Sequence, residues 1–294
     1  MKKLLITAAG LTVLLAGCVQ DPSGEVTDAE NIENLVQGSV YAAMSPLEGR
    51  GESGGGTDAF FPEHWWRSLN SEEPRDFILE NDPATGICTV TVTRSLDATL
   101  NIDVTHDGIL NPGTKPISDI RTRRLIVERT GDETDPHGGW ELTHITPAVY
   151  ALNSGREQEV YPLSMRVYSG DELIWECDDT DTFYRIDDGL PVLAPGTLVR
   201  VEAEFLHTNP VYQPPFYAYV HGPCPVWPRH WMNDEGLWGD RVAGDGTLSY
   251  EWYVEESSDH WFVAVDVLDA DTMLDEEEDD YDSGAWGILA LKSQ

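Results

Sequence analysis

A long alternation of apolar and polar residues is the feature that most constrains how this chain can fold. Residues 88–104 read CTVTVTRSLDATLNIDV, and every second residue from Cys88 onward is apolar, with Arg94 as the exception. Successive side chains of a β-strand point to opposite faces, so this pattern gives the segment one buried face and one polar face. It predicts one long bent strand or a hairpin in this part of the chain.

Helical patterns are confined to the residues before this strand. Thr27 and Glu30 have the spacing of a capping box, in which the Thr27 side chain accepts a hydrogen bond from the Glu30 backbone. The apolar residues that follow recur at helical spacing and predict one helix that ends at Pro46. A second short helix is expected over residues 60–69 (FFPEHWWRSL), with its aromatic side chains as core anchors.

Short strands are expected over the rest of the chain. In the first half they fall at residues 75–80, 125–129 and 140–145, while residues 111–116 carry turn residues. The segment NSGRE at residues 153–157 reads as a linker, and helical periodicity ends there. Many short strands separated by Gly, Pro and Asp turns are typical of a β-sandwich. The strands expected beyond the linker are 160–168, 172–176, 182–186, 197–207, 216–221, 248–254, 261–268 and 285–291.

The order of these elements resembles two known folds. Two helices that lead into a curved antiparallel sheet resemble the NTF2-like α+β fold, and RLIVERTG…GGWELTHITP resembles its closing hairpin. The strands after the linker resemble an Ig-like β-sandwich. The expected fold class is therefore α+β followed by all-β, with an NTF2-like domain at 27–152 and an Ig-like domain at 158–294.

The start of the chain has the layout of an export signal. Lys2 and Lys3 precede an uncharged run in MKKLLITAAGLTVLLAGC, and this run is too short to cross a bilayer as a helix. Its last four residues, LAGC, resemble the lipobox of bacterial lipoproteins. That resemblance implies a signal peptide at 1–18, lipid attachment to Cys18 and a tether at 19–26. An ordinary cleaved signal with an accidental cysteine is the alternative.

The resemblance and the charge of the chain together limit location and partners. Valine at position 19 favours the outer membrane over the inner membrane under the rule known for enterobacterial lipoproteins. The chain has 18 basic and 53 acidic residues, a net charge of −35, which repels nucleic acid and anionic lipid headgroups. The expected partners are the membrane, reached through the lipid, and an unidentified protein, glycan or small-molecule ligand.

One glycine-rich loop carries candidate ligands for a metal ion. Residues 233–248, NDEGLWGDRVAGDGTL, resemble a D-D-G-x-x-G-D-x-x-A-G-D-G loop of bacterial extracellular Ig-like modules. The carboxylates of Asp234, Glu235, Asp240 and Asp245 are the hard oxygen ligands that Ca²⁺ prefers. The alternative is that these side chains hydrogen-bond their own turns, as Asp does beside Gly.

Cysteine and histidine offer weaker signals. After Cys18 the chain has Cys88, Cys177 and Cys224, and either a Cys177–Cys224 disulfide or three separate thiols fits an oxidising compartment. The ligand types for zinc occur in HGPCPVWPRH as His221, Cys224 and His230, but the spacing matches no known finger, which favours structural roles. The acidic run DEEEDDYD at residues 275–282 is expected to be a solvated loop.

No motif for a nucleophile elbow, a metalloprotease helix, a P-loop or a dinucleotide site occurs in the sequence. The main expectation is therefore a nonenzymatic cell-envelope lipoprotein with binding or structural modules. One alternative is an enzyme that uses His144 as a base, paired with Asp97 or Asp103, in the cone of the NTF2-like domain. Another is an adhesin or a component of a surface assembly.

Overall fold

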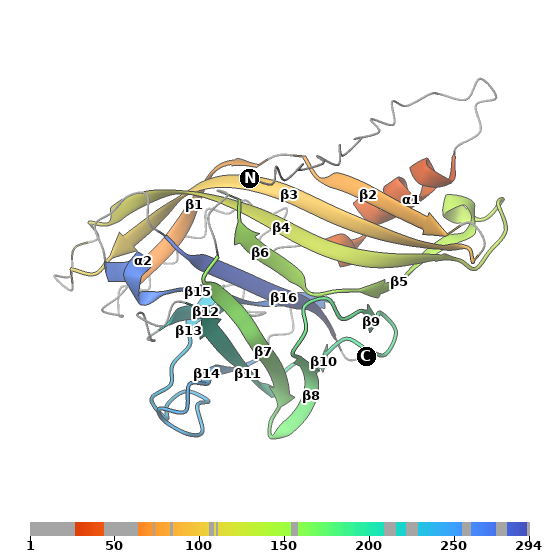
Figure 1. The fold of residues 1–294 in the computed structure, drawn as a ribbon. Helices are drawn as coiled ribbons and strands as arrows, with labels where there is room; N and C mark the ends of the chain where they lie inside the picture. The colour runs from red at the N-terminus through yellow and green to blue at the C-terminus, as the bar shows by residue number, and fades with distance from the viewer. Residues whose placement is uncertain are drawn as a thin grey trace, which may run out of the picture.

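The computed structural model describes residues 27–43, 64–72, 74–82, 85–105, 109, 111–153, 158–208, 216–221, 229–254, 260–274 and 281–292. Within these ranges the chain is mostly β-strand, arranged in one twelve-stranded and one four-stranded sheet, with few helices (Figure 1). The β-rich, curled antiparallel character expected from the sequence is confirmed.

The large sheet follows one path of eight strands, each antiparallel to its neighbours, with four further strands attached to it. Along the path the strands are β1 (His64–Glu72), β3 (Ile87–Asp103), β4 (Gly113–Arg129), β6 (Ala148–Leu152), β16 (Ser283–Lys292), β15 (His260–Leu268), β12 (Tyr217–His221) and β13 (Arg229–Trp231). The attached strands are β2 (Asp76–Asp82), β5 (Trp140–Ile145), β9 (Tyr184–Arg185) and β10 (Val192–Leu193).

The β3–β4 hairpin is the longest part of this sheet. Its register runs from Ile87 opposite Glu128 to Ile102 opposite Gly113, so the alternation at residues 88–104 forms one strand. Buried and partly exposed side chains alternate along both strands, as the pattern predicts. The turn expected at residues 111–116 is shorter than predicted, because β4 already begins at Gly113.

The first expected helix is confirmed and the second is wrong. Helix α1 (Asp28–Gln37) has the capping box: the Thr27 backbone donates to Glu30 Oε2 at 2.8 Å, and the Glu30 backbone donates to Thr27 Oγ1 at 3.3 Å. The helix ends at Gly38, and a separate 3₁₀ turn, η1 (Val40–Ala42), follows. Residues 64–69, expected to be helical, lie in β1 instead, where aromatic side chains such as Trp65 pack well against a sheet.

The second sheet lies against the large one. Its order is β14 (Leu248–Tyr253), β11 (Leu198–His207), β7 (Val160–Ser169) and β8 (Glu172–Cys177). The strand expected at 197–207 is confirmed as β11, with Val199, Val201, Ala203 and Phe205 buried as its alternation predicts. The strand expected at 182–186 is only the two-residue β9. Two short helical segments, η2 (Pro136–Gly139) and α2 (Ala270–Leu274), complete the described chain.

Of the linker expected at 153–157, residues 154–157 lie outside the described residues, and strands from before and after it share the large sheet. Strand β6, which precedes it, pairs with β16 at the other end of the chain, with Tyr150 opposite Ala285 and Ala148 opposite Gly287. A Cβ atom at Gly287 would lie 2.6 Å from the backbone oxygen of Val263, so the close approach of β15 and β16 requires glycine there. One continuous core contains buried residues from both sides of position 153.

Candidate functional site

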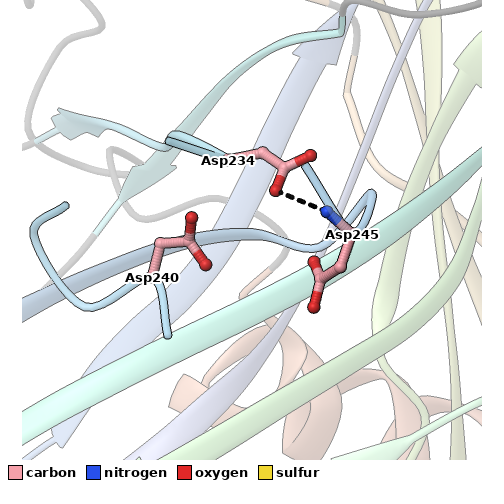
Figure 2. A group of neighbouring side chains, drawn as sticks. All are labelled: Asp234, Asp240 and Asp245. Carbon is pink, nitrogen blue, oxygen red and sulfur yellow. Dashed lines mark hydrogen bonds between the residues drawn. The ribbon is translucent and has the colours of Figure 1, made fainter. Parts of the chain in front are cut away.

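The loop between β13 and β14 brings together three of the four acidic residues expected to bind a metal. One carboxylate oxygen from each of Asp234, Asp240 and Asp245 lies within 4.8 Å of the others (Figure 2). Glu235 is exposed and is not part of this group. Three clustered carboxylates could supply part of the six to eight oxygen ligands of Ca²⁺.

Backbone N–H groups of the same loop already occupy these carboxylates. Asp234 Oδ1 accepts from the backbone of Gly244 at 2.7 Å and of Asp245 at 3.1 Å, and Oδ2 accepts from Gly246 at 2.9 Å. Asp240 accepts from Gly236 at 2.5 Å and Val242 at 3.1 Å, and Asp245 accepts from Thr247 at 2.9 Å. These contacts match the alternative in which the aspartates organise their own turns, so calcium binding stays a prediction.

Gly236, Gly239, Gly244 and Gly246 of this loop all have positive φ, and Gly239 also has no room for a Cβ atom. Gly239 has φ 106°, and a Cβ atom there would lie 2.9 Å from the backbone nitrogen of Glu251 in β14. Glu251 N also donates to the carbonyl of Trp238 at 2.9 Å, which ties the loop to the small sheet. The glycines that the sequence singled out therefore serve the shape of the loop.

The expected pair of His144 with Asp97 or Asp103 does not form. His144 Nδ1 lies 2.8 Å from Thr143 Oγ1 and 3.9 Å from Glu128 Oε1. His144 pairs with Ile126 of β4, and Ile126 in turn pairs with Thr89 of β3. Asp97 lies eight residues beyond Thr89 on β3, which is roughly 26 Å along the strand at about 3.3 Å per residue. The pairing register of β3, β4 and β5 places His144 far from both aspartates, and the alternation of residues in the sequence does not specify that register.

A charged cluster that the sequence analysis missed lies in the large sheet. It consists of Arg67 from β1, Asp119 from β4, His221 from β12 and Asp266 from β15, and is called the arginine cluster below. Arg67 Nη1 donates to Asp266 Oδ2, Arg67 Nε lies 3.5 Å from Asp119 Oδ2, and His221 Nε2 lies 3.7 Å from Asp266 Oδ2. Burial alone would raise the pKa of Asp266, but Arg67 and His221 outweigh it and hold the pKa well below its usual range.

Aromatic rings and further arginines surround the arginine cluster. Trp65 packs edge-on against Tyr219 at 5.4 Å, and the Arg229 guanidinium lies 3.7 Å from the centre of the Tyr219 ring. Among the described residues, Trp65 Nε1, His221 Nδ1 and Asp266 Oδ1 have no hydrogen-bond partner. The cluster therefore holds a partly buried histidine beside a buried, strongly acidic carboxylate.

The sequence contains a signal for this cluster. Asp119, Arg121 and Arg123 occupy the same alternating positions of β4 as the apolar Leu125 and Val127, and all five are buried. Side chains two residues apart on a strand point to the same face, so this spacing places the three charged side chains inside with Leu125 and Val127. Charged residues are ordinarily assigned to the solvent face.

A second cluster of titratable groups joins the two sheets, and it is called the acidic cluster below. His207 Nε2, at the end of β11, lies 3.1 Å from Asp269 Oδ2 after β15 and 3.9 Å from Glu159 Oε2 before β7. Asp282, before β16, accepts a hydrogen bond from the Glu159 backbone. Burial, together with the neighbouring Asp269 and Glu159 carboxylates, raises the pKa of Asp282 to about 7.

The two histidines considered for zinc point to different environments. His230 is opposite Val220, so its ring lies on the other face of the sheet from His221. It stacks on Tyr250, with ring centres 4.5 Å apart and an interplanar angle of 8°. Cys224 lies outside the described residues. The two histidines cannot contribute to one zinc site in this arrangement.

Both described cysteines are buried. Within the described part of the chain neither Cys88 nor Cys177 forms a disulfide, and burial raises the pKa of each thiol. Cys177 Sγ lies 3.3 Å from the Asp179 carbonyl oxygen. The disulfide partner expected for Cys177, Cys224, lies outside the described residues, as do Cys18 and residues 275–280 of the acidic run.

Comparisons with protein-family models, with curated proteins and with solved structures each return no match for this chain. In the part of the chain that the structure describes, no helix has the length and apolar character needed to cross a membrane.

Proposed function

We propose that this chain is a lipid-anchored protein of the bacterial cell envelope that acts as a binding or structural module, with the outer membrane as its location. The observation that carries the proposal is the sequence of its first 18 residues: two lysines, an uncharged run and LAGC. This arrangement provides an export signal and a thiol that can carry lipid. Two or more acyl chains hold a protein at a membrane far more stably than one chain does.

The position of the first described element supports this proposal. Only residues 19–26 separate Cys18 from the capping residue Thr27, and α1 begins immediately afterwards. A folded body that starts this close to the cysteine is suited to a fixed position at a membrane. The NTF2-like and Ig-like assignments of its two parts remain part of the proposal. Strand patterns support them, while only the first of the two expected helices forms and both parts contribute strands to the large sheet.

Two features favour a binding or structural role over catalysis. His144 is separated from both aspartates with which it was expected to act. The described histidine–aspartate pairs, His221–Asp266 and His207–Asp269, lie in clusters that join strands of the body, and their carboxylates are buried. Such pairs serve as internal cross-links between elements far apart in the sequence.

The test compares the wild-type chain with Cys18→Ser in a bacterium that processes lipoproteins. The wild-type protein is expected in the membrane fraction and, when an inhibitor of the lipoprotein signal peptidase is added, as a larger precursor. Cys18→Ser is expected to leave the membrane fraction and to be insensitive to the inhibitor. Cys88→Ser is the matched control, because it removes a buried thiol and leaves the anchor intact. Equal membrane association of Cys18→Ser and wild type would contradict the proposal.

A further inference from the structure

The N-terminal helix is fixed to one end of the large sheet. Ile32 and Val36, 1% and 0% exposed, bury one face of α1 in the main core. At its first turn, Asp28 pairs with Arg129 at the end of β4 and accepts a hydrogen bond from Trp140 Nε1 at 3.2 Å. The start of the helix is therefore held beside the loop that connects β4 and β5.

A buried arginine holds the other end of this segment. Arg123 of β4, 1% exposed, donates from Nη1 to the carbonyl oxygens of Tyr41, at 2.9 Å, and Ala43. Its guanidinium also lies 5.2 Å from the centre of the Phe262 ring in β15. Residues 27–43 are thus attached to the sheet at both ends, so the start of α1 has a defined position on the body. Figure 1 shows α1 beside the end of the large sheet.

The distance from Cys18 to this fixed point is short. Residues 19–26 can span at most about 28 Å, at about 3.5 Å per residue, whatever their conformation. The β3–β4 hairpin extends from the Ile87 and Arg129 end, beside α1, to the Asp103 and Gly113 end. Its sixteen paired positions span roughly 50 Å at about 3.3 Å per residue, which exceeds the reach of the tether.

We propose that the end of the body formed by α1 and the loop at residues 130–139 faces the membrane, while the Asp103 and Gly113 end points away from it. The inference rests on the lipid anchor proposed for Cys18. Figure 1 shows α1 far from the segment that connects β13 and β14, so the loop of Asp234, Asp240 and Asp245 also lies away from the bilayer.

The charges of this end indicate which lipid surface it fits. Asp28, Glu30 and Glu33 lie on α1, and Asp132, Glu133 and Asp135 lie on the neighbouring loop. The basic side chains described there are Arg129, which pairs with Asp28 and lies 3.9 Å from Glu133, and His137. An excess of negative charge repels anionic headgroups, so this end fits a zwitterionic surface and stands off an anionic one.

The test measures energy transfer from the body to labelled lipid. The lipidated full-length protein, purified from membranes, is placed in phosphatidylcholine vesicles that contain an acceptor-labelled lipid. The donor dye is attached to Glu133→Cys or to Thr114→Cys, both in a Cys224→Ser background, because Cys88 and Cys177 are buried. Both label positions are exposed, and Glu133 is 88% exposed.

Transfer from position 133 is expected to be about threefold or more higher than from position 114, because Glu133 lies beside Arg129, and Thr114 lies roughly 50 Å from Arg129 along β4. Adding anionic lipid at low salt is expected to reduce the transfer from position 133, and high salt is expected to restore it. Equal transfer from the two positions, or higher transfer from position 114, would overturn the orientation.

A tether control and a flotation control separate the two proposals. Inserting about 60 Gly/Ser residues after Ser23 adds a flexible segment with a root-mean-square end-to-end distance of roughly 43 Å. This insertion is expected to reduce the difference in transfer between the two positions. An unchanged difference would show that the tether does not orient the body. Flotation with vesicles is measured on the same samples. Protein that fails to float overturns the anchor itself, whereas protein that floats without the difference overturns only the orientation.

Discussion

The arginine cluster and the acidic cluster both bury aspartate, but their carboxylates have opposite properties. In the arginine cluster, Asp266 lies against Arg67, and its pKa is well below the usual range. In the acidic cluster, Asp282 lies near Asp269 and Glu159, and its pKa is raised to about 7. The comparison shows that burial alone does not decide whether a carboxylate stabilises this fold; the charge of its nearest neighbours does.

The pH dependence of the two clusters should therefore have opposite signs. The folded-state pKa of Asp266 is depressed, so its stabilisation is present above its unfolded pKa and is lost as the pH falls through the folded value. The folded-state pKa of Asp282 is raised, so its protonated form stabilises the fold below its unfolded pKa. That contribution is lost as the pH rises toward 7.

Removing the arginine should have the largest effect. Arg67→Met leaves Asp119 and Asp266 buried without their cation, and the expected loss is about 3–5 kcal/mol of unfolding free energy. The measurement is urea unfolding of residues 19–294 without lipid at pH 7. The matched control is Arg166→Met, which breaks more exposed pairs with Glu176 and Glu204 and should cost about 1 kcal/mol or less. Equal losses for both variants would contradict the role given to the arginine cluster.

The aspartates of the β13–β14 loop provide a third case for this comparison, because backbone N–H groups rather than an arginine stabilise their carboxylates. Asp234→Ala leaves the backbone donors of Asp245 and Gly246 without their acceptor, while Gly244 N still donates to the Asp234 carbonyl oxygen, and the change should cost about 2 kcal/mol. Asp245→Ala removes the acceptor of one such donor and should cost about 1 kcal/mol. Thermal and urea unfolding of both variants measure the difference. A larger loss for Asp245→Ala would show that the hydrogen bonds do not determine the role of the loop.

Removing the charge of Asp282 should stabilise the protein. Asp282→Asn eliminates an ionised carboxylate near Asp269 and Glu159, so unfolding free energy at pH 8 should rise by about 1–2 kcal/mol. Between about pH 4 and pH 7 the stability of the variant should fall less steeply than that of wild type. Glu176→Gln, at an exposed position, should leave this slope unchanged. A variant with the wild-type slope would show that Asp282 does not titrate in this range.

Calcium gives the smallest expected effect and decides between the two interpretations of the loop. If Asp234, Asp240 and Asp245 bind Ca²⁺, millimolar calcium raises the Tm of wild type, while Asp240→Asn reduces that rise. If the aspartates serve only their own turns, the Tm in calcium equals the Tm in chelator. Because their hydrogen bonds already hold the loop, we expect a shift of at most a few degrees, on the order of 1 kcal/mol or less.

Local features of the fold were predictable from the sequence. The alternation from Cys88 gives β3, and the capping box at Thr27 gives α1, because both depend on residues close together in the chain. The helix expected at residues 60–69 is wrong because residues 64–72 form β1 and pair with β3. The spacing of residues within this segment does not show that pairing. The pairing of β6 with β16 joins residues more than a hundred positions apart, and no local pattern specifies it.

The candidate sites follow the same division. The acidic loop is local, and three of its four expected residues come together. The arginine cluster contains Arg67, Asp119, His221 and Asp266 from four strands, so these residues come together only in the folded sheet. The alternating spacing along β4 indicates that Asp119, Arg121 and Arg123 face inward, but it does not identify their partners.

The mass of the N-terminal peptide, measured on protein purified from bacterial membranes, tests the central claim most directly. A peptide that begins at Cys18 and carries the added mass of acyl chains is the predicted result. A peptide that lacks lipid, whether it begins at another residue or still includes residues 1–17, would contradict the anchor and the membrane orientation that depends on it.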